Sequence, residues 1–260
     1  MDLKLSGKKA LITGASKGIG KATAKALASE GCDLILVSRT ERDLLNVKST
    51  IGETSSTKIC IEALDLSVSG TSEQLAKSHP EIDILVNNAG AIPGGSLEEI
   101  NEEQWRSAWD LKVFGYINMC RSFYTKMKVR NSGTIVNIIG NAGETKDPSY
   151  ICGVAANASL AAFSQSLGSV SPKDGIRVLG INPGPIATDR MKMLMQHKLD
   201  RGDLPNNSDG ELFSHLPFGR AGSPEEIAAA VCFLASEQSG YSSGSIMTID
   251  AGLSIRGGHR

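Results

Sequence analysis

The sequence predicts a single α/β domain in which helices cover both faces of a parallel β-sheet. Short apolar runs of strand length alternate with longer segments of helical periodicity along the 260 residues. Such βαβ units force neighbouring strands to run parallel, and parallel sheets are covered on both faces. In addition, a glycine-rich segment at 13–20 lies between the first strand and the first helix. We therefore expect one doubly wound, Rossmann-type domain over 1–260.

Each expected element is marked by its own residues. The apolar run 9–12 is the first strand, and the helix from about 18 to 30 is stopped by Gly31. A helix over 224–236 has proline in its first turn and Ser223 as its N-cap. The other strands are expected at 34–37, 58–61, 82–86, 134–138, 177–181 and 246–249, and the other helices at 101–128 and 150–170.

Composition excludes several classes of partner. The net charge of −1 gives no general attraction to nucleic acid or to anionic lipid. No apolar run is long enough to span a bilayer, and the segment 1–9 has no apolar signal core. We therefore expect a cytoplasmic protein without a nucleic-acid or membrane partner.

The cysteines predict neither a disulfide framework nor a metal site. The five thiols, at 32, 60, 120, 152 and 232, are odd in number and scattered, with no CxxC pair and no Cys/His cluster. This pattern is typical of a reduced compartment. The sequence predicts no bound metal.

The glycine-rich segment has the pattern of a phosphate-binding turn. Gly14, Gly18 and Gly20 let the backbone turn sharply and approach a pyrophosphate, and the following helix offers free N–H groups at its positive end. The alternative is a tight βα turn that binds no ligand.

The end of the second strand favours NADP(H) over NAD(H). An acidic residue there would bind the ribose 2′-hydroxyl of NAD, but 37–40 reads Val-Ser-Arg-Thr. Arg39 can pair with a 2′-phosphate, and Lys17 in the glycine turn can do so from the other side. The alternative is that both are solvated surface cations.

Further motifs follow in order along the chain. They are a TGxxxGxG turn at 13–20, Asp65-Leu66, an Asn-Asn-Ala-Gly segment at 87–90, Asn-Pro-Gly-Pro-Ile-Ala-Thr at 182–188, and a C-terminal pattern from Pro217 to Gly252. In these motifs the chain resembles the short-chain dehydrogenase/reductase family nearly end to end. The resemblance implies about seven parallel strands, hydride transfer between a nicotinamide and a carbonyl or alcohol carbon, and commonly a tetramer.

The same resemblance implies which residues hold the cofactor. They are Gly14, Ser16, Lys17, Gly18, Ile19, Gly20, Arg39, Asp65, Leu66, Asn88, Ala89, Gly90, Pro183, Gly184, Ile186 and Thr188. In the family, the carboxamide of the nicotinamide is held by the segment that corresponds to 183–188.

The family's catalytic positions are filled differently in this chain. The family uses a serine at a strand end, a tyrosine, a lysine four residues later, and an asparagine on the preceding helix. Here those positions hold Gly140, Gly153, Asn157 and Lys112, in that order. The spacing from Gly140 to Gly153 fits the family's interval. The asparagine and the lysine therefore look exchanged between two helices.

Four residues are candidates for the chemistry: Lys112, Asn157, Tyr150 and Asn141. We expect Lys112 to supply a charge and a proton, because a desolvated lysine titrates nearer neutral pH. The alternative is an inactive pocket in which Lys112 only braces the cofactor. Tyr150, one helical turn before Gly153, either reaches the vacated space or, as we favour, lines the substrate pocket. Asn141 is a possible amide donor.

The charged residues of the following loop, Glu144, Lys146 and Asp147, are interpreted as solvated. The segment 189–216 is rich in methionine and then polar, which predicts a substrate lid over an apolar small molecule. Its alternative is a variable surface loop.

Three functions remain open at this point: a reductase or dehydrogenase with a rebuilt acid, an enzyme acting on an activated double bond or a substrate that needs no strong acid, and a non-catalytic NADP(H) sensor or assembly protein. The resemblance also implies a homo-oligomer, a tetramer or a dimer, with 101–128 and 150–170 as its interface helices. The alternative is that both helices only cover the sheet.

Overall fold

The computed structural model describes residues 1–200, 213, 214 and 216–256. Within this part of the chain, one parallel sheet has seven strands in the order β3-β2-β1-β4-β5-β6-β7. They are β1 (Lys9–Thr13), β2 (Asp33–Ser38), β3 (Ile59–Ala63), β4 (Ile84–Asn87), β5 (Gly133–Ile138), β6 (Ile176–Pro183) and β7 (Ile246–Ile249). The strand order reverses between β1 and β4, so the predicted doubly wound fold is confirmed, and this switch point is where such sheets bind ligands.

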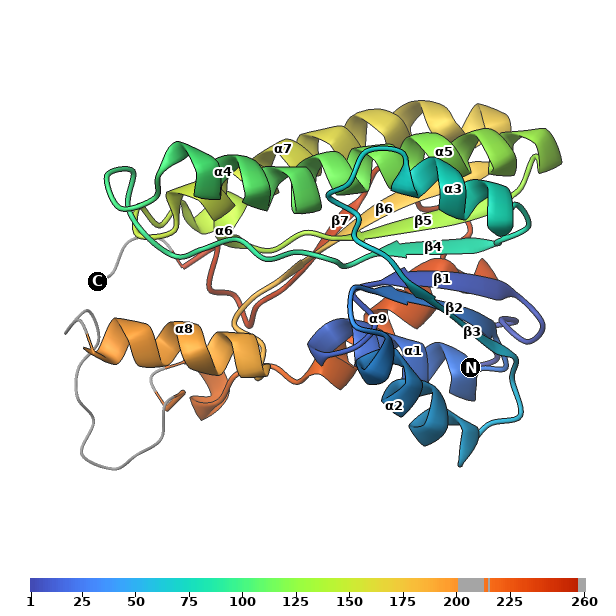
Figure 1. Cartoon of the computed structure of the whole chain (residues 1–260), viewed down its shortest axis with the longest axis horizontal. Coiled ribbons are helices and arrows are strands. Elements are labelled where there is room, and N and C mark those ends of the chain that lie inside the picture. Colours follow the sequence, from blue (N-terminus) through green and yellow to red (C-terminus); the bar gives the residue numbers. More distant parts are fainter. Residues whose placement is uncertain (201–212, 215, 257–260) are drawn as a thin grey trace.

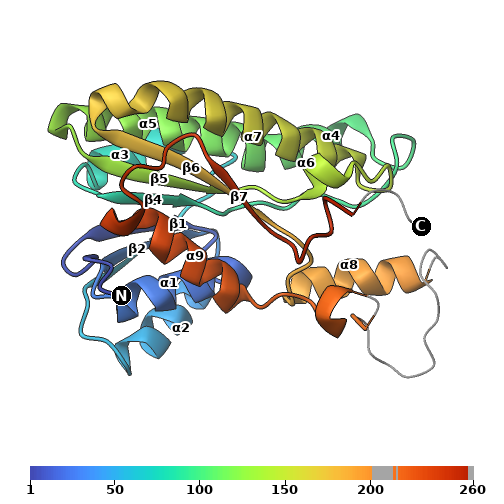
Figure 2. The ribbon, with the colours of Figure 1, turned by 180° about the vertical axis from the view of Figure 1, so that it is seen from behind.

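Helices cover both faces of the sheet (Figures 1 and 2). The described helices of the α type are α1 (Gly18–Ser29), α2 (Glu41–Gly52), α3 (Thr71–Ser78), α4 (Glu102–Trp109), α5 (Gly115–Arg130), α6 (Ala142–Thr145), α7 (Ile151–Val170), α8 (Asp189–Asp200) and α9 (Pro224–Ala235). Helices α1, α2 and α9 lie on one face, and α3, α5 and α7 on the other. The core has a part on each face of the sheet. On β1, Ile12 packs into one part and its neighbour Leu11 into the other, because successive side chains of a strand point to opposite faces.

The segment expected as one helix over 101–128 is interrupted. A capping box of Asn101 and Gln104 begins α4, and α5 ends at Asn131, which adopts the left-handed conformation. Between them lies a π-helical turn, Asp110–Phe114. Such turns insert an extra residue per turn and occur often at functional sites. Lys112 is the central residue of this turn.

The predicted ends of two helices are confirmed. Gly31 follows α1 with φ +83°, a conformation that suits glycine. The Ser223 hydroxyl accepts a hydrogen bond from the Glu226 backbone N–H at 3.2 Å, and the Glu226 carboxylate accepts one from the Ser223 N–H. Of the predicted lid at 189–216, α8 is described, whereas 201–212 and 215 lie outside the described residues. Among the described helices, none is both long and apolar enough to cross a membrane.

Candidate active site

The glycine turn requires its glycines for local geometry. Gly14 and Gly18 have φ values of +64° and +50°, which side-chain-bearing residues rarely adopt. A Cβ atom on Gly20 would overlap the Gly14 carbonyl oxygen. The N-terminus of α1 has no side-chain cap, so its first backbone N–H groups stay available to an anion.

The loop after β4 is fastened to this turn. Asn88 Nδ2 donates to the carbonyl oxygens of Thr13 and Gly14 at 3.1 and 3.2 Å. In return, Thr13 Oγ1 accepts hydrogen bonds from the backbone N–H groups of Asn88 and Ala89 at 2.9 and 3.0 Å. These four hydrogen bonds fix the loop after β4 against the end of β1 and the glycine turn.

A carboxylate lies close to Lys17, one of the two cations expected to bind a 2′-phosphate. The sequence did not predict this contact. Lys17 Nζ lies 3.4 Å from Asp43 Oδ2, in the first turn of α2. Arg39 is exposed at the end of β2. Partial burial raises the pKa of Asp65, but hydrogen bonds from Ser67 and the charge of Arg39 outweigh it and hold the pKa below its usual value. Asp65 therefore stays ionised as an acceptor near this edge.

The Pro-Gly segment lies beside the glycine turn. A Cβ atom on Gly18 would stand 3.0 Å from Thr188 Cγ2. Thr188 Oγ1 also accepts a hydrogen bond from the Met191 backbone N–H at 3.2 Å, as an N-cap does. Thr188 thus connects the start of α8 to the glycine turn.

Lys112 reaches the end of β5 from the π-helical turn. Its Nζ donates to the Ile139 carbonyl oxygen at 2.5 Å, and its stem lies against Gly90, where a Cβ atom would be 3.0 Å from Lys112 Cδ. Burial, together with the positive charge of Arg190, lowers the pKa of Lys112 to about 7. Ammonium and amine are therefore both accessible near neutral pH.

Gly140 and Asn157 face each other next to this lysine. Gly140 has φ +133°, and a Cβ atom on it would lie 2.8 Å from Asn157 Nδ2. Asn157 is buried, with 3 % of its surface exposed, and its Oδ1 has no hydrogen-bond partner within the described structure. A buried acceptor without a partner is uncommon, and a bound ligand is one way to satisfy it.

Tyr150 occupies the space that a side chain at position 153 would need. A Cβ atom on Gly153 would overlap the Tyr150 ring at Cε1 and Cζ. Burial raises the pKa of the Tyr150 phenol, and the charge and hydrogen bond of Arg190 act in the opposite direction without cancelling this effect. The phenol is therefore protonated near neutral pH and is positioned by Arg190.

Arg190 is a site residue that the sequence reading missed. Its Nη1 donates to the Gly90 carbonyl oxygen at 2.7 Å and its Nη2 to the Ile92 carbonyl oxygen at 2.6 Å. It thereby ties the first turn of α8 to the loop after β4. An arginine inside a variable-looking segment carries no sequence signal of such a contact.

Asn141 and Glu144 lie toward the ends of β6 and β7. Asn141 Nδ2 donates to Asp250 Oδ2 at 3.2 Å, so that amide is engaged within the protein. Glu144 Oε1 accepts hydrogen bonds from Asn182 Nδ2 at 2.6 Å and Thr248 Oγ1 at 3.1 Å. Glu144 is exposed, in keeping with its interpretation as a solvated charge, and its two hydrogen bonds fasten α6 to the sheet.

Comparison with known proteins identifies the family. The model of short chain dehydrogenases matches residues 8–199. The chain belongs to the short chain dehydrogenase family. Among curated members, the chain is 32 % identical over 257 residues to the 3-oxoacyl-[acyl-carrier-protein] reductase FabG of Chlamydia muridarum, covering 97 % of this chain and 100 % of the relative. It is 30 % identical to FabG of Haemophilus influenzae over 249 residues, covering 96 % and 99 %.

Solved structures of the family agree over the whole fold. L-sorbose reductase of Gluconobacter frateurii, solved with NADPH and L-sorbose, has a TM-score of 0.85 and 32 % identity over 96 % of this chain and 98 % of that one. Levodione reductase has a TM-score of 0.89 and 27 % identity, covering 96 % and 99 %. YwfH, an NADPH-dependent reductase involved in bacilysin biosynthesis, has a TM-score of 0.86 and 29 % identity, covering 95 % and 98 %. The prediction of an oxidoreductase of this family is confirmed, and the non-catalytic alternative is not favoured.

Proposed function

We propose that this chain is an atypical short chain dehydrogenase that reduces a carbonyl group with NADPH, with Lys112 as the proton donor. The observation that carries the proposal is the placement of Lys112. Its ammonium is partly buried at the end of β5, donates to the Ile139 carbonyl oxygen at 2.5 Å, and has a pKa of about 7. General acids work best when their pKa lies near the working pH.

The residues around the glycine turn suit a dinucleotide. The glycine turn and the uncapped start of α1 suit a pyrophosphate, and the unpaired Asn157 Oδ1 suits a hydroxyl donor of a ligand. Lys17 and Arg39 are two exposed cations that suit a 2′-phosphate, which favours NADP(H) over NAD(H). The family members solved with NADPH support the same choice. Bound there, the cofactor supplies a hydride to the carbonyl carbon.

Side chains of the protein supply the proton. The Lys112 ammonium donates a proton to the carbonyl oxygen as negative charge develops on it. The neighbouring Arg190 charge makes Lys112 a stronger acid, because two cations repel. The amine left behind regains its proton from solvent. Tyr150, held by Arg190, forms an aromatic wall of the pocket. Asn157 offers an amide beside the reacting group.

Substrate binding involves the segment that begins with α8. The described start of this segment is tied to the loop after β4 through Arg190, and its methionines suit an apolar small molecule. We propose the whole chain, 1–260, as one domain in which 189–216 acts as the substrate lid.

We also propose a homo-oligomer, a tetramer or a dimer, in a cytoplasmic setting. A surface groove along α4 is lined by Leu97, Trp105 and Phe114, among others. Leu97 and Phe114 are 65 % and 51 % exposed. Contiguous exposed apolar side chains of this kind often mark a protein interface. Light scattering on Phe114→Glu would show a smaller mass than the wild type if this face joins two copies.

The test of function is NADPH oxidation with carbonyl substrates of the kinds that named relatives reduce: a 3-oxoacyl thioester, L-sorbose and levodione. We expect turnover of at least one by the wild type and a loss of about 10²–10⁴ in kcat for Lys112→Met. Lys48→Met, at an exposed position on α2, is the matched control and should keep full activity. NADPH binding without any turnover, or full activity of Lys112→Met, would overturn the proposal.

A further inference from the structure

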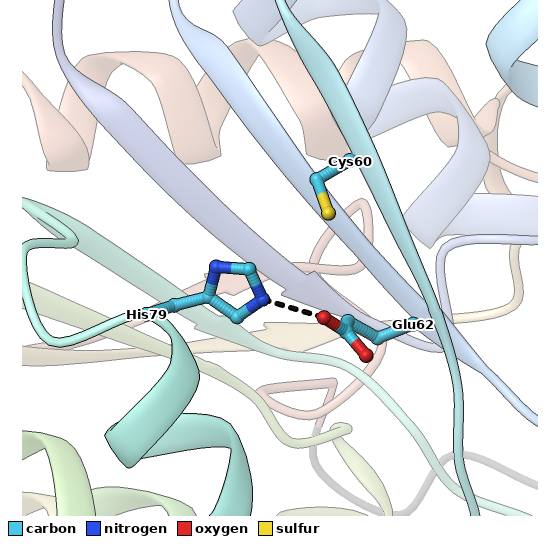
Figure 3. A group of neighbouring side chains, drawn as sticks. All are labelled: Cys60, Glu62 and His79. Atoms are coloured by element: carbon cyan, nitrogen blue, oxygen red, sulfur yellow. Dashed lines mark hydrogen bonds and ion pairs between the residues drawn. The ribbon is translucent and has the colours of Figure 1, made fainter.

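Three side chains of metal-ligand type meet at an edge of the sheet, away from Lys112. Cys60 and Glu62 are two residues apart on β3, so they project from the same face of an edge strand. His79 caps the C-terminus of α3 and approaches them from that helix (Figure 3). One ligand atom from each residue, the Sγ, a carboxylate oxygen and a ring nitrogen, all lie within 4.8 Å of one another. No sequence motif indicates this cluster, because Glu62 and His79 are 17 positions apart in the chain.

We propose that Cys60, Glu62 and His79 form a binding site for Zn²⁺. The ring nitrogen Nε2 of His79 lies 2.7 Å from Glu62 Oε1, at present as a hydrogen-bonded pair. In a tetrahedral zinc site, Zn–N and Zn–O bonds of about 2.0–2.2 Å and Zn–S bonds of about 2.3 Å separate the ligand atoms by about 3.3–3.7 Å. The ion would therefore enter in place of the shared proton, with the side chains moving by about 1 Å or less.

The ligand chemistry favours zinc over the common hard cations. A thiolate and an imidazole suit Zn²⁺, whereas Mg²⁺ and Ca²⁺ require oxygen ligands. A thiolate and a carboxylate together neutralise the charge of the ion, and the neutral imidazole adds none. Within the described residues, the ion-pair partner of Glu62 is His79, so no lysine or arginine competes for that carboxylate.

The site is accessible and leaves room for water. Cys60 is exposed, and the side chains of His79 and Glu62 are 18 % and 27 % exposed. Three protein ligands with one open side match a zinc ion that keeps a water molecule as its fourth ligand. Binding would connect β3 to the end of α3, so zinc should raise the stability of the folded chain.

The experiment is a titration of the full-length, reduced, metal-free protein with ZnCl₂ against a chelating dye, followed by the same titration with Co²⁺. We expect one equivalent of Zn²⁺ to bind, and Co²⁺ to give a thiolate-to-cobalt charge-transfer band in the near ultraviolet. Cys60→Ser should abolish that band. Cys60→Ser and His79→Gln should each weaken zinc binding at least about tenfold, as for loss of a metal ligand.

Glu62→Gln is compared with Glu73→Gln, an exposed glutamate on α3 that serves as the matched control. We expect weaker zinc binding only for Glu62→Gln. NADPH affinity, measured by fluorescence, reports that each variant is folded and should not change. Absence of stoichiometric binding, a missing thiolate band in the wild type, or equal affinities for the wild type and Cys60→Ser would overturn the proposal.

Discussion

The ring of Tyr150 covers Gly153, one turn further along the chain, at the start of α7. A side chain on residue 153 would overlap ring atoms Cε1 and Cζ, so the aromatic residue and the glycine depend on each other. Arg190 holds the phenol from the α8 side. The lack of a side chain at 153 therefore leaves the room that the Tyr150 ring fills.

Gly153→Ala tests this dependence. The added methyl group would force the Tyr150 ring aside, and overpacking of this kind costs about 1–3 kcal/mol in the free energy of unfolding. The double variant Gly153→Ala with Tyr150→Ala should lose less than the sum of the single variants, as a denaturation-based double-mutant cycle would show. Gly52→Ala is the control, because nothing lies within 4 Å of a Cβ atom there. Strict additivity would contradict the account.

Gly140→Ser should not create a working serine site. The backbone at 140 has φ +133°, and the new Cβ would stand 2.8 Å from Asn157 Nδ2. A strained backbone position costs about 1–3 kcal/mol, so we expect a lower free energy of unfolding in urea. We also expect no gain in kcat, since in the proposed mechanism Lys112 provides the proton. A rise in kcat would show that the pocket still functions with a serine at this position.

The cations at the adenosine end should decide between the two cofactors. Hydrogen bonds to charged groups contribute about 1.5–3 kcal/mol, and solvent exposure reduces this, so Arg39→Ala should weaken NADPH binding about tenfold. NADH binding should stay the same. Asp43→Asn should strengthen NADPH binding, because it frees Lys17 from a carboxylate 3.4 Å away. Fluorescence titrations with both cofactors check this; equal losses for NADH and NADPH would exclude a 2′-phosphate contact.

Lys112 should lower stability in a pH-dependent way. Its pKa falls from 10.5 in an exposed lysine to about 7 in the folded chain, so between these values the unfolded chain binds the extra proton. The wild type therefore gains stability as pH rises from about 7, and bears the full cost of the buried charge below that pH. Lys112→Met should be more stable than the wild type by about 1–4 kcal/mol at about pH 6, and by less at about pH 9. Urea denaturation at both pH values measures this, and a pH-independent difference would contradict it.

The strands of the sheet were predicted from the sequence more completely than the helices. Every predicted strand is present because continuous apolar runs such as 34–37 are typical of strands buried on both faces. Helices α2 and α3 were not predicted, since only three or four residues of each are buried and their apolar pattern is weak. The π-helical turn around Lys112 was also missed, because one inserted residue leaves the helical periodicity of 101–128 almost unchanged.

The site was predictable where a motif exists and unpredictable where contacts are long-range. Gly14 and Asn88 belong to motifs, and the structure brings them together as expected. Arg190 contacts carbonyl oxygens 98 and 100 positions earlier in the chain, and no local pattern signals such a contact. The Lys17–Asp43 pair depends in the same way on how α2 packs beside the glycine turn.

The most direct measurement of the role of Lys112 is the pH dependence of hydride transfer in a single turnover, with excess enzyme, NADPH and the carbonyl substrate that the wild type reduces fastest. Only the ammonium form can donate, so the rate should be constant below about pH 7 and fall about tenfold per pH unit above it. Lys112→Met should be slower by about 10²–10⁴ and should lack this transition, with unchanged NADPH affinity. A variant with the wild-type rate and the same pH profile would contradict the account.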